Sequence, residues 1–468
     1  MKRRPIIDRS MNPVSYRADR AVGEYVASGR MPGASLLMAR DGFVHEKAYG
    51  HSDADKKTPA TTDTKYMAAS ITKQFAAAAA LKLASRGLLG LDEKISGYFP
   101  ELPGWKESVT VRSMMNHSSG IPDYFDRDFI DKYCYAPAAD GDESAMSAIS
   151  SFRELKFAPG GEHLYSNSGY VLLGKIIEKI ARRPFADFAR EELLAPAGMS
   201  DSVFLNSGEL PKGAAVGYCV PNGAFEASPF NRISVGWADG NLCTTARDLY
   251  KWHMALLKKT VVSESEQQQA FSPLILPDGR QTGAGFGFFI GERGGLREIW
   301  HTGSTPSYTS RFSRFTDLPD GGNAAIILLC NADAEDVDDF NALFGRLAHI
   351  LLEDVYSPAA KARTATCALE KISGHYASAL DEELICGVCP EGEGIRLVGK
   401  LRGFKRGVHA DYAGSDPDSG EEVFYAADGA DVVISFKGDS MTINDIGRIA
   451  YLSRGKREED NPAGRGGR

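Results

Sequence analysis

Strand-forming segments stand at both ends of the first 355 residues, and helix-forming segments fill the stretch between them. The strand segments are 33–39, 43–49, 286–290, 296–300, 308–315 and 324–329. Asp41-Gly42 between the first two is a strong hairpin turn signal, so antiparallel pairing is expected. This order predicts an α/β (α+β) fold: an antiparallel sheet assembled from distant parts of the chain, flanked by helices, with a helical subdomain inserted over roughly residues 66–240.

Helices are expected where apolar residues recur every three or four positions. The expected helices cover residues 14–29, 70–86, 110–116, 167–182, 245–258 and 335–354. Residues 134–150 are rich in Ala, Asp and Ser, and this composition predicts a surface excursion. One domain is therefore expected over residues 1–355.

The sequence pattern changes after residue 355. Residues 356–364 carry Ser, Pro, Ala and Lys and are typical of a linker. Short alternating segments then lie between Gly- and Asp-rich turns, at 394–401, 422–425 and 432–436. They predict a small all-β domain over residues 365–453, followed by a charged, Gly-rich tail over 454–468 that is expected to be disordered.

The formal net charge of −8 argues against a nucleic-acid-binding protein with a broad basic face. No uninterrupted apolar segment reaches the roughly 18 residues that a membrane span needs. Residues 1–9 are positively charged but no apolar run follows them, so no secretory signal is predicted. The chain is expected to be soluble and cytoplasmic, with a small molecule or short peptide as its partner.

The seven cysteines are an odd number scattered over a long chain, which fits reduced thiols better than a disulfide framework. Cys386-Gly-Val-Cys389 has the spacing of a metal or redox pair. A structural zinc site normally needs a second pair or matching histidines, and neither lies nearby. Two unconnected thiols are the favoured interpretation, and a zinc or cysteine-based protein stays open as an alternative.

The first motif with chemical meaning is Ser70-Ile71-Thr72-Lys73, which opens a predicted helix and places Ser70 and Lys73 on one face. Serine is a weak nucleophile until a base takes its proton, and a lysine is such a base where burial or nearby positive charge lowers its pKa. The helix N-terminus also favours the negative charge of a tetrahedral intermediate. Alone the motif is weak, because Ser453-Arg-Gly-Lys456 matches it too.

The second motif is Tyr165-Ser166-Asn167, just before an apolar helix. A tyrosine near cations can act as a general base or acid, and the Asn167 amide can orient Lys73 or a substrate carbonyl. The alternative is a core tyrosine followed by a helix-capping asparagine.

The third motif is His301-Thr302-Gly303-Ser304, between an apolar strand and a turn. Gly303 would let the backbone approach a ligand closely, and the Ser304 N–H could pair with that of Ser70 in an oxyanion hole. The alternative is a strand end with a satisfied histidine.

Together the motifs are far more specific than apart. Penicillin-binding proteins and class A β-lactamases carry a parallel set, Ser-x-x-Lys with Ser-Asp-Asn and Lys-Thr-Gly. The chain resembles this penicillin-recognising serine hydrolase superfamily, and more closely its class C β-lactamase-like branch of D-aminopeptidases, carboxypeptidases, esterases and β-lactamases. The resemblance covers roughly residues 15–355; it includes 115–121, similar to a Leu-x-His-x-Ser-Gly loop, and 240–249, similar to the segment before a late helix. The C-terminal β domain is similar to lipocalin-like domains of some peptidases in this group.

The resemblance implies that Ser70 forms an acyl-enzyme, that Lys73 and Tyr165 move its proton, and that the Ser70 and Ser304 amides hold the oxyanion. It implies neither a metal nor an organic cofactor. Substrate binding would involve Asn167, His301, Thr302 and Gly303. Penicillin-recognising members often carry lysine where this chain has His301, which is a weaker cation at neutral pH. This difference favours peptidase, amidase or esterase chemistry over β-lactam recognition.

The predicted function is hydrolysis of an amide or ester bond, with a D-amino-acid-containing peptide or amide as the leading substrate class. A carboxylesterase or a weak β-lactamase on the same site is the alternative, and a non-catalytic binding protein on the same scaffold is the rival class. The C-terminal domain could shape access to the site or form a homo-oligomer.

Overall fold

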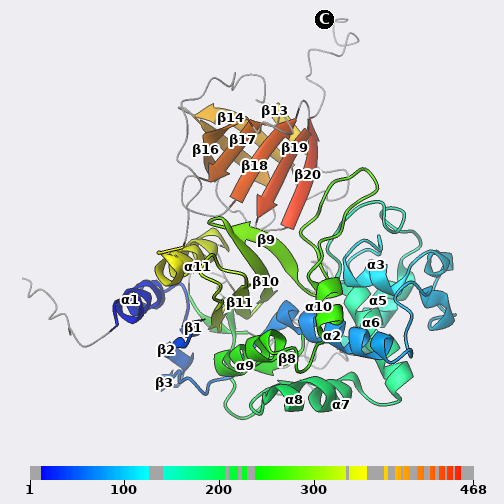
Figure 1. Cartoon of the computed structure of the whole chain (residues 1–468), viewed down its shortest axis with the longest axis horizontal. Coiled ribbons are helices and arrows are strands. Elements are labelled where there is room, and N and C mark those ends of the chain that lie inside the picture. The colour runs from blue at the N-terminus through cyan, green and yellow to red at the C-terminus, as the bar shows by residue number, and fades with distance from the viewer. Residues whose placement is uncertain are drawn as a thin grey trace, which may run out of the picture. The chain divides into compact units, whose positions relative to one another are not determined.

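The computed structural model of the chain describes residues 12–125, 141–205, 210–219, 224–228, 238–333 and 337–355 and, between 374 and 454, eight strands. The chain divides into two compact units (Figure 1). The first comprises residues 1–290, 297–335 and 346–355, and the second comprises 291–296, 336–345 and 356–468. No helix among the described residues is long and apolar enough to span a bilayer.

A seven-stranded sheet, most of whose residues belong to the first unit, has the strand order β3-β2-β1-β12-β11-β10-β9 (Figure 1). Its strands are β1 (Gly33–Arg40), β2 (Phe43–Asp53), β3 (Thr58–Pro59), β9 (Phe289–Arg293), β10 (Leu296–Thr305), β11 (Tyr308–Phe315) and β12 (Ala324–Cys330). The pairs from β3 to β10 are antiparallel. The first hairpin joins the later strands where β1 pairs with β12, with Leu37 opposite Ile327. The predicted sheet of distant chain segments is confirmed.

The β1–β2 hairpin closes as its sequence predicts. Asp41 and Gly42 both have positive φ, 46° and 91°, which matches the right-handed twist of the two strands. Strands β1 and β12 are buried along almost their whole length, because helices cover both faces of the sheet. Helix α1 (Pro13–Ala27) packs on β1 and β2, while α9 (Ala246–Leu257) packs on β1 and β12.

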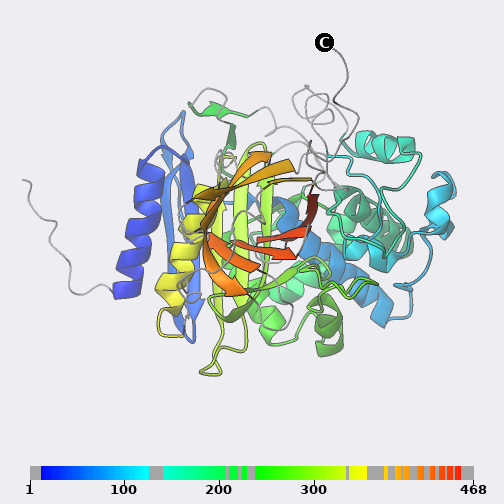
Figure 2. The ribbon, with the colours of Figure 1, turned by 90° about the horizontal axis from the view of Figure 1, so that it is seen from above.

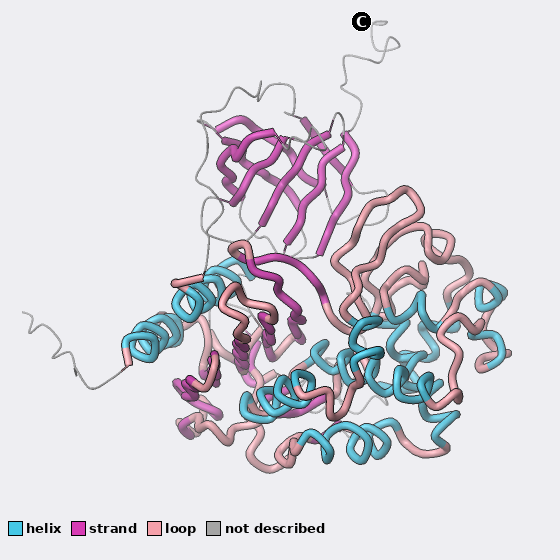
Figure 3. The backbone as a smooth tube through the Cα atoms, viewed as in Figure 1, coloured by secondary structure: helices cyan, strands magenta, loops and turns pink. Residues whose placement is uncertain are grey.

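Most of the remaining helices of the first unit gather beside the strands (Figure 3). They are α2 (Thr72–Ser85), α3 (Val111–Met115), α5 (Gly141–Ser151), α6 (Asn167–Ala181), α7 (Phe185–Ala189), α8 (Ala195–Ala197), α10 (Glu264–Ala270), the 3₁₀ turns η1 (Ala69–Ile71), η2 (Ile95–Gly97) and η3 (Gly104–Glu107), and the π turn η5 (Arg190–Leu194). Helix α11 (Val337–Leu352) follows the last strand of the sheet. Two short sheets complete the described part of this unit: β4 (Tyr66–Met67), β8 (Leu242–Thr244) and β5 (Val203–Phe204), and β6 (Tyr218–Cys219) with β7 (Glu226–Ala227).

Helix α5 corrects the sequence prediction for residues 134–150. A surface excursion was expected there, whereas residues 141–151 form a helix with Ala145 and Ile149 buried. These two side chains are four residues apart, so they share one face of the helix. That face packs into the core beside α6, which a composition rich in Asp and Ser did not indicate.

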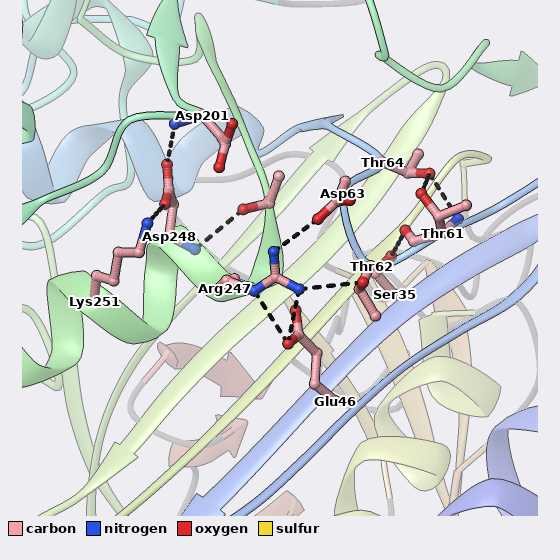
Figure 4. A network of polar contacts seen from close by, with 11 residues as sticks. Ser35, Glu46, Thr61, Thr62, Asp63, Thr64, Asp201, Arg247, Asp248 and Lys251 are labelled. Carbon is pink, nitrogen blue, oxygen red and sulfur yellow. Dashed lines mark hydrogen bonds and ion pairs between the residues drawn. The ribbon is translucent and has the colours of Figure 1, made fainter.

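The first turn of α9 joins the sheet to the helices (Figure 4). Arg247 donates to Glu46 of β2 at 3.1 Å and to Asp63 at 2.7 Å. The neighbouring buried Asp248 accepts hydrogen bonds from the Asp201 N–H and from Lys251 (Figure 4). The neighbouring residues Arg247 and Asp248 thus connect α9 to two different parts of the unit, β2 on one side and the loop at Asp201 on the other.

Eight strands of the second unit form a closed barrel in sequence order. They are β13 (Gly374–Ala377), β14 (Ile385–Glu391), β15 (Gly394–Lys400), β16 (Val408–Ser415), β17 (Glu422–Ala426), β18 (Val432–Lys437), β19 (Ser440–Asp445) and β20 (Arg448–Arg454). β13 also pairs with β20, so each strand has two neighbours and the barrel has no open edge. Figure 2 shows the ring of these strands from a second direction. The domain boundaries predicted at 356–364 and 454–468 fall almost wholly outside the described residues and stay predictions.

Candidate active site

Ser70 lies at the entrance to α2. The 3₁₀ turn Ala69–Ile71 leads directly into the helix, and Ser70 is partly exposed while its neighbours Ala69 and Ile71 are buried. Ala69 has a φ of 48°, a left-handed conformation that costs a non-glycine residue about 1–3 kcal/mol. Backbone strain of this kind persists where surrounding contacts enforce it, and here the Ala68 N–H donates to the Leu242 carbonyl at 2.8 Å.

Lys73 is fully buried one turn further along and points at Ser70. Its Nζ lies 3.0 Å from Ser70 Oγ, 2.7 Å from Asn167 Oδ1 and 2.7 Å from the Asp239 carbonyl oxygen. The amide and carbonyl oxygens can only accept, so two of the three positions on Nζ carry hydrogens. The third faces the Ser70 hydroxyl, which can both donate and accept. Of the three contacts of Nζ, the contact with Ser70 Oγ is therefore the one that joins it to a group able to both donate and accept.

Tyr165 lies beside the same ammonium group. Lys73 Nζ is 5.1 Å from the centroid of the Tyr165 ring and 5.6 Å from that of Tyr170. The His117 ring stacks on Tyr165, with the ring centroids 4.3 Å apart and an interplanar angle of 27°. His117 Nδ1 accepts the Ser166 N–H at 3.2 Å, so this nitrogen carries no proton. The stacked imidazole and the adjacent backbone together fix the position of Tyr165.

Asn167 is the first residue of α6, and its cap position is taken by Ser166. The alternative prediction of Asn167 as a helix cap is therefore wrong. Its amide oxygen faces Lys73, and its Nδ2 donates to Asp123 Oδ2 at 3.0 Å.

Asp239 supplies the third contact to Lys73 through its main chain, while its carboxylate accepts the Tyr124 hydroxyl at 2.8 Å. Burial raises the pKa of Asp239, and the positive charge of Lys73 offsets part of that rise.

The end of β10 lies against the turn that carries Ser70. A Cβ atom on Gly303 would come within 2.1 Å of the Ala68 carbonyl oxygen, so only glycine fits at this position. Ser310, opposite Gly303 on β11, donates to the same Ala68 oxygen at 2.9 Å. Gly303 was expected to let the backbone approach a ligand, and the structure shows that it lets β10 approach the backbone before Ser70.

His301, Thr302 and Ser304 differ in their surroundings. His301 is buried, with its ring 6.1 Å from that of Tyr165 and 5.1 Å from that of Phe289. His301 Nδ1 lies 2.5 Å from the Thr302 carbonyl, which can only accept, so Nδ1 carries a hydrogen. Thr302 is half-buried, and Ser304 is exposed with its hydroxyl 3.4 Å from Asp333. The roles of Thr302 in substrate binding and of the Ser304 N–H in an oxyanion hole stay predictions.

The Beta-lactamase family model matches residues 18–349 of the chain, well over half of its length. The chain belongs to the Beta-lactamase family. Penicillin-binding protein 4* of Bacillus subtilis is 28% identical over 395 residues, which cover 79% of this chain and 84% of that protein. D-amino acid amidase from Ochrobactrum anthropi SV3 is 26% identical, with a TM-score of 0.63 over 73% of this chain and 99% of that one. The octameric penicillin-binding protein homologue from Pyrococcus abyssi shares the fold, at 24% identity and a TM-score of 0.64, over 94% of this chain and 99% of that one.

This Beta-lactamase family member is a serine hydrolase. The resemblance drawn from the three motifs is confirmed for the superfamily and the fold, while the roles of individual residues stay predictions. The structure brings Ser70, Lys73, Tyr165 and Asn167 together on the helical side and places Gly303 against the same turn.

Sequence reasoning missed four residues of this site: His117, Asp123, Tyr124 and Asp239. His117 lies inside the loop at 115–121 that was recognised, and Asp239 immediately precedes the recognised segment at 240–249. Asp123 and Tyr124 lie just after this loop. Their closeness in sequence to a recognised motif was the signal that could have indicated a place in the site.

The two cysteines of the zinc alternative, Cys386 and Cys389, lie on one strand. Both residues lie on β14, opposite Gly399 and Arg396 of β15, and their side chains are outside the described part of the structure. Among the residues that are described, no group of three or more His, Cys, Asp or Glu could hold a metal ion.

Proposed function

We propose that the chain is a serine amidase or peptidase that forms an acyl-enzyme on Ser70, with D-amino-acid-containing peptides or amides as its substrates. The contact of Lys73 Nζ with Ser70 Oγ at 3.0 Å carries the proposal. Two neutral oxygens hold the other positions of Nζ, so a neutral Lys73 directs its lone pair at the Ser70 hydroxyl.

In the acylation step the Ser70 hydroxyl proton passes to Lys73 as Oγ attacks the substrate carbonyl carbon. The carbonyl oxygen becomes an oxyanion, for which the N–H groups of Ser70 and Ser304 are the proposed donors. Collapse of the tetrahedral intermediate breaks the C–N bond, and the leaving nitrogen takes a proton delivered through Lys73 and Tyr165. The product is an ester of Ser70 and a free amine.

Deacylation runs the same proton path in reverse. A water molecule loses its proton to the Tyr165–Lys73 pair and attacks the ester carbon. Ser70 leaves with a proton returned from that pair, and a carboxylic acid is released. No step needs a redox change, and each proton taken is given back within one cycle.

The substrate class rests on the relatives and on His301. The solved structure most similar in sequence among those described above is named as a D-amino acid amidase, and the Bacillus subtilis relative is named as a penicillin-binding protein. His301 supplies a weaker cation than lysine for a free substrate carboxylate. We therefore place amides ahead of β-lactams, with carboxylester hydrolysis as the second candidate because the acyl-enzyme chemistry is the same.

Intact-protein mass spectrometry after incubation with a fluorophosphonate tests the nucleophile. A single adduct mapped to Ser70 is expected, and no adduct on folded protein would favour a non-catalytic binding protein. Steady-state rates on D-phenylalanine amide, L-phenylalanine amide, p-nitrophenyl butyrate and a penicillin then rank the substrate classes. Turnover of the ester without measurable turnover of either amide would move the assignment to an esterase.

Assembly is a separate part of the proposal. The Pyrococcus abyssi homologue is described as octameric, and we propose that this chain also forms a homo-oligomer through its second unit. Light scattering on the purified chain is expected to give a mass above the 50.6 kDa of one copy. A mass of one copy across the micromolar range would contradict it.

A further inference from the structure

Asp123 lies directly behind Asn167 and contacts it twice. Its Oδ1 accepts the backbone N–H of Asn167 at 3.1 Å, and its Oδ2 accepts the Asn167 side-chain N–H at 3.0 Å. Oδ1 also accepts the Phe125 N–H at 3.2 Å, which fixes the carboxylate relative to its own loop. One carboxylate thus engages both the main chain and the side chain of the first residue of α6.

A primary amide has an oxygen that accepts and a nitrogen that donates, so an isolated asparagine could present either end to Lys73. A carboxylate only accepts, so Asp123 draws the NH₂ end of Asn167 towards itself. The oxygen end is then left for Lys73 Nζ, at 2.7 Å. We infer that Asp123 is a positioning residue of this site, which fixes the Asn167 amide with its oxygen facing Lys73.

The consequence for Lys73 follows from the geometry around Nζ. If Asn167 turned its NH₂ group to Lys73, an N–H of Nζ would face an N–H of Asn167. A neutral Lys73 could avoid this clash only by pointing its lone pair at Asn167, and the lone pair would then no longer face Ser70. With Asp123 in place, the lone pair of a neutral Lys73 is directed at the Ser70 hydroxyl. This inference rests on the proposed function of Ser70 and Lys73.

Asp123 differs from the other groups around Lys73. Asp239 holds Nζ through a main-chain oxygen that no side-chain substitution removes. Tyr165 and Tyr170 face Nζ with their rings. Among the described hydrogen bonds of Lys73 Nζ, the one to Asn167 is the bond whose acceptor is itself oriented by a second side chain, Asp123.

The first variant is Asp123→Asn, which keeps the shape of the side chain. An amide accepts through one atom and a carboxylate through two, so in either orientation Asn at this position leaves one donor facing a donor on residue 167. We expect kcat on D-phenylalanine amide and the rate of fluorophosphonate labelling of Ser70 to fall by about tenfold or more, with KM changed by less than about threefold.

The second variant exchanges the two side chains, Asp123→Asn with Asn167→Asp. The amide at 123 then accepts the backbone N–H of residue 167 and donates to the new carboxylate, whose other oxygen faces Lys73. Every hydrogen bond of the original pair is restored, but a carboxylate now lies beside Lys73 and favours its protonated form, as it also does in Asn167→Asp alone. We therefore expect the exchange to label Ser70 more slowly than the parent and at least about fivefold faster than Asn167→Asp, which has the same charge beside Lys73 without the restored pair. The matched control is Asp92→Asn, an exposed aspartate of the same unit that binds Arg112, and it should match the parent.

The outcomes separate the two proposals. Failure to label Ser70 in the parent protein overturns the proposed function. Normal labelling of the parent, with Asp123→Asn within twofold of it or with losses that simply add in the exchanged variant, overturns the role of Asp123 alone. If thermal unfolding shows that Asp123→Asn is not folded, Asn167→Asp and the exchanged variant are compared instead. Asn167→Asp sets two carboxylates against each other, so an exchange no faster than Asn167→Asp also overturns the inference.

Discussion

Lys73 and Arg311 are both fully buried cations of the first unit, and their surroundings are opposite in kind. Arg311 lies 3.1 Å from the Glu298 carboxylate and 4.5 Å above the Trp300 ring, and it also donates to Ser313. Lys73 donates to neutral amide and carbonyl oxygens and faces the hydroxyl of a partly exposed serine. The Glu298 carboxylate compensates the charge of the buried Arg311 guanidinium, whereas the oxygens within hydrogen-bond distance of Lys73 Nζ are neutral. We therefore expect substitutions in the Arg311 group to change stability and substitutions in the Lys73 group to change activity.

The largest effect is expected for substitution of Ser70, which should remove activity and leave stability nearly unchanged. Ser70→Ala removes the attacking oxygen, so we expect kcat/KM to fall by roughly 10⁴-fold or more while the thermal unfolding midpoint stays close to that of the parent. The control is Ser453→Ala, at the serine of the second Ser-x-x-Lys match, which should leave both quantities unchanged. Hydrolysis at the parent rate in Ser70→Ala would refute the assignment.

The Arg311 group should show the reverse pattern. Glu298→Ala leaves a buried guanidinium without its carboxylate, so we expect a loss of about 3–5 kcal/mol in the free energy of unfolding, measured by urea titration. The kcat of the protein that remains folded should stay within about twofold. Asp92→Ala breaks an exposed pair with Arg112 and should change the urea midpoint little. A loss in Glu298→Ala no larger than in this control would contradict the comparison.

Tyr165 and Tyr170 give a matched pair next to Lys73. Tyr165→Phe keeps the ring that stacks on His117 and removes only the hydroxyl, so we expect kcat to fall by about 10²-fold. Tyr170→Phe removes a hydroxyl that donates to the Met115 carbonyl at 2.6 Å, so it should cost about 1 kcal/mol of stability and less than about threefold in kcat. Equal rate losses in the two variants would show that ring placement matters and the Tyr165 hydroxyl does not.

The smallest effect concerns Asp239. Because burial raises its pKa, the unfolded chain loses this proton at lower pH than the folded chain, and stability falls as pH rises through the interval between the two pKa values. Asp239→Asn keeps an acceptor for Tyr124 and removes the buried charge, so it should be more stable than the parent by about 1 kcal/mol at neutral pH. Urea midpoints measured from acid to neutral pH should show this difference vanishing at low pH. A difference that is constant with pH would rule out the carboxylate as its source.

The sequence by itself determined the order of elements and the three motifs. Asp41-Gly42 fixed the first hairpin because few residue pairs adopt positive φ, and local periodicity placed α2, α6 and α9 within a few residues of their observed bounds. Such features depend on neighbouring residues, so a linear sequence displays them. Helix α5 was missed because its buried face became apparent only against α6.

The tertiary structure decided which polar groups meet Lys73. Asn167 is 94 residues away in the chain and Asp239 is 166 residues away, and no local pattern encodes contacts at such separations. Asp123 reaches the site only because its loop docks on the first turn of α6. Gly303 has its role because β10 packs against the backbone at Ala68. Neighbours along the chain set the tendency of a segment to form a helix, a strand or a turn. The partners of a hydrogen bond such as Lys73–Ser70 also depend on atoms that folding brings to about 3 Å from each other.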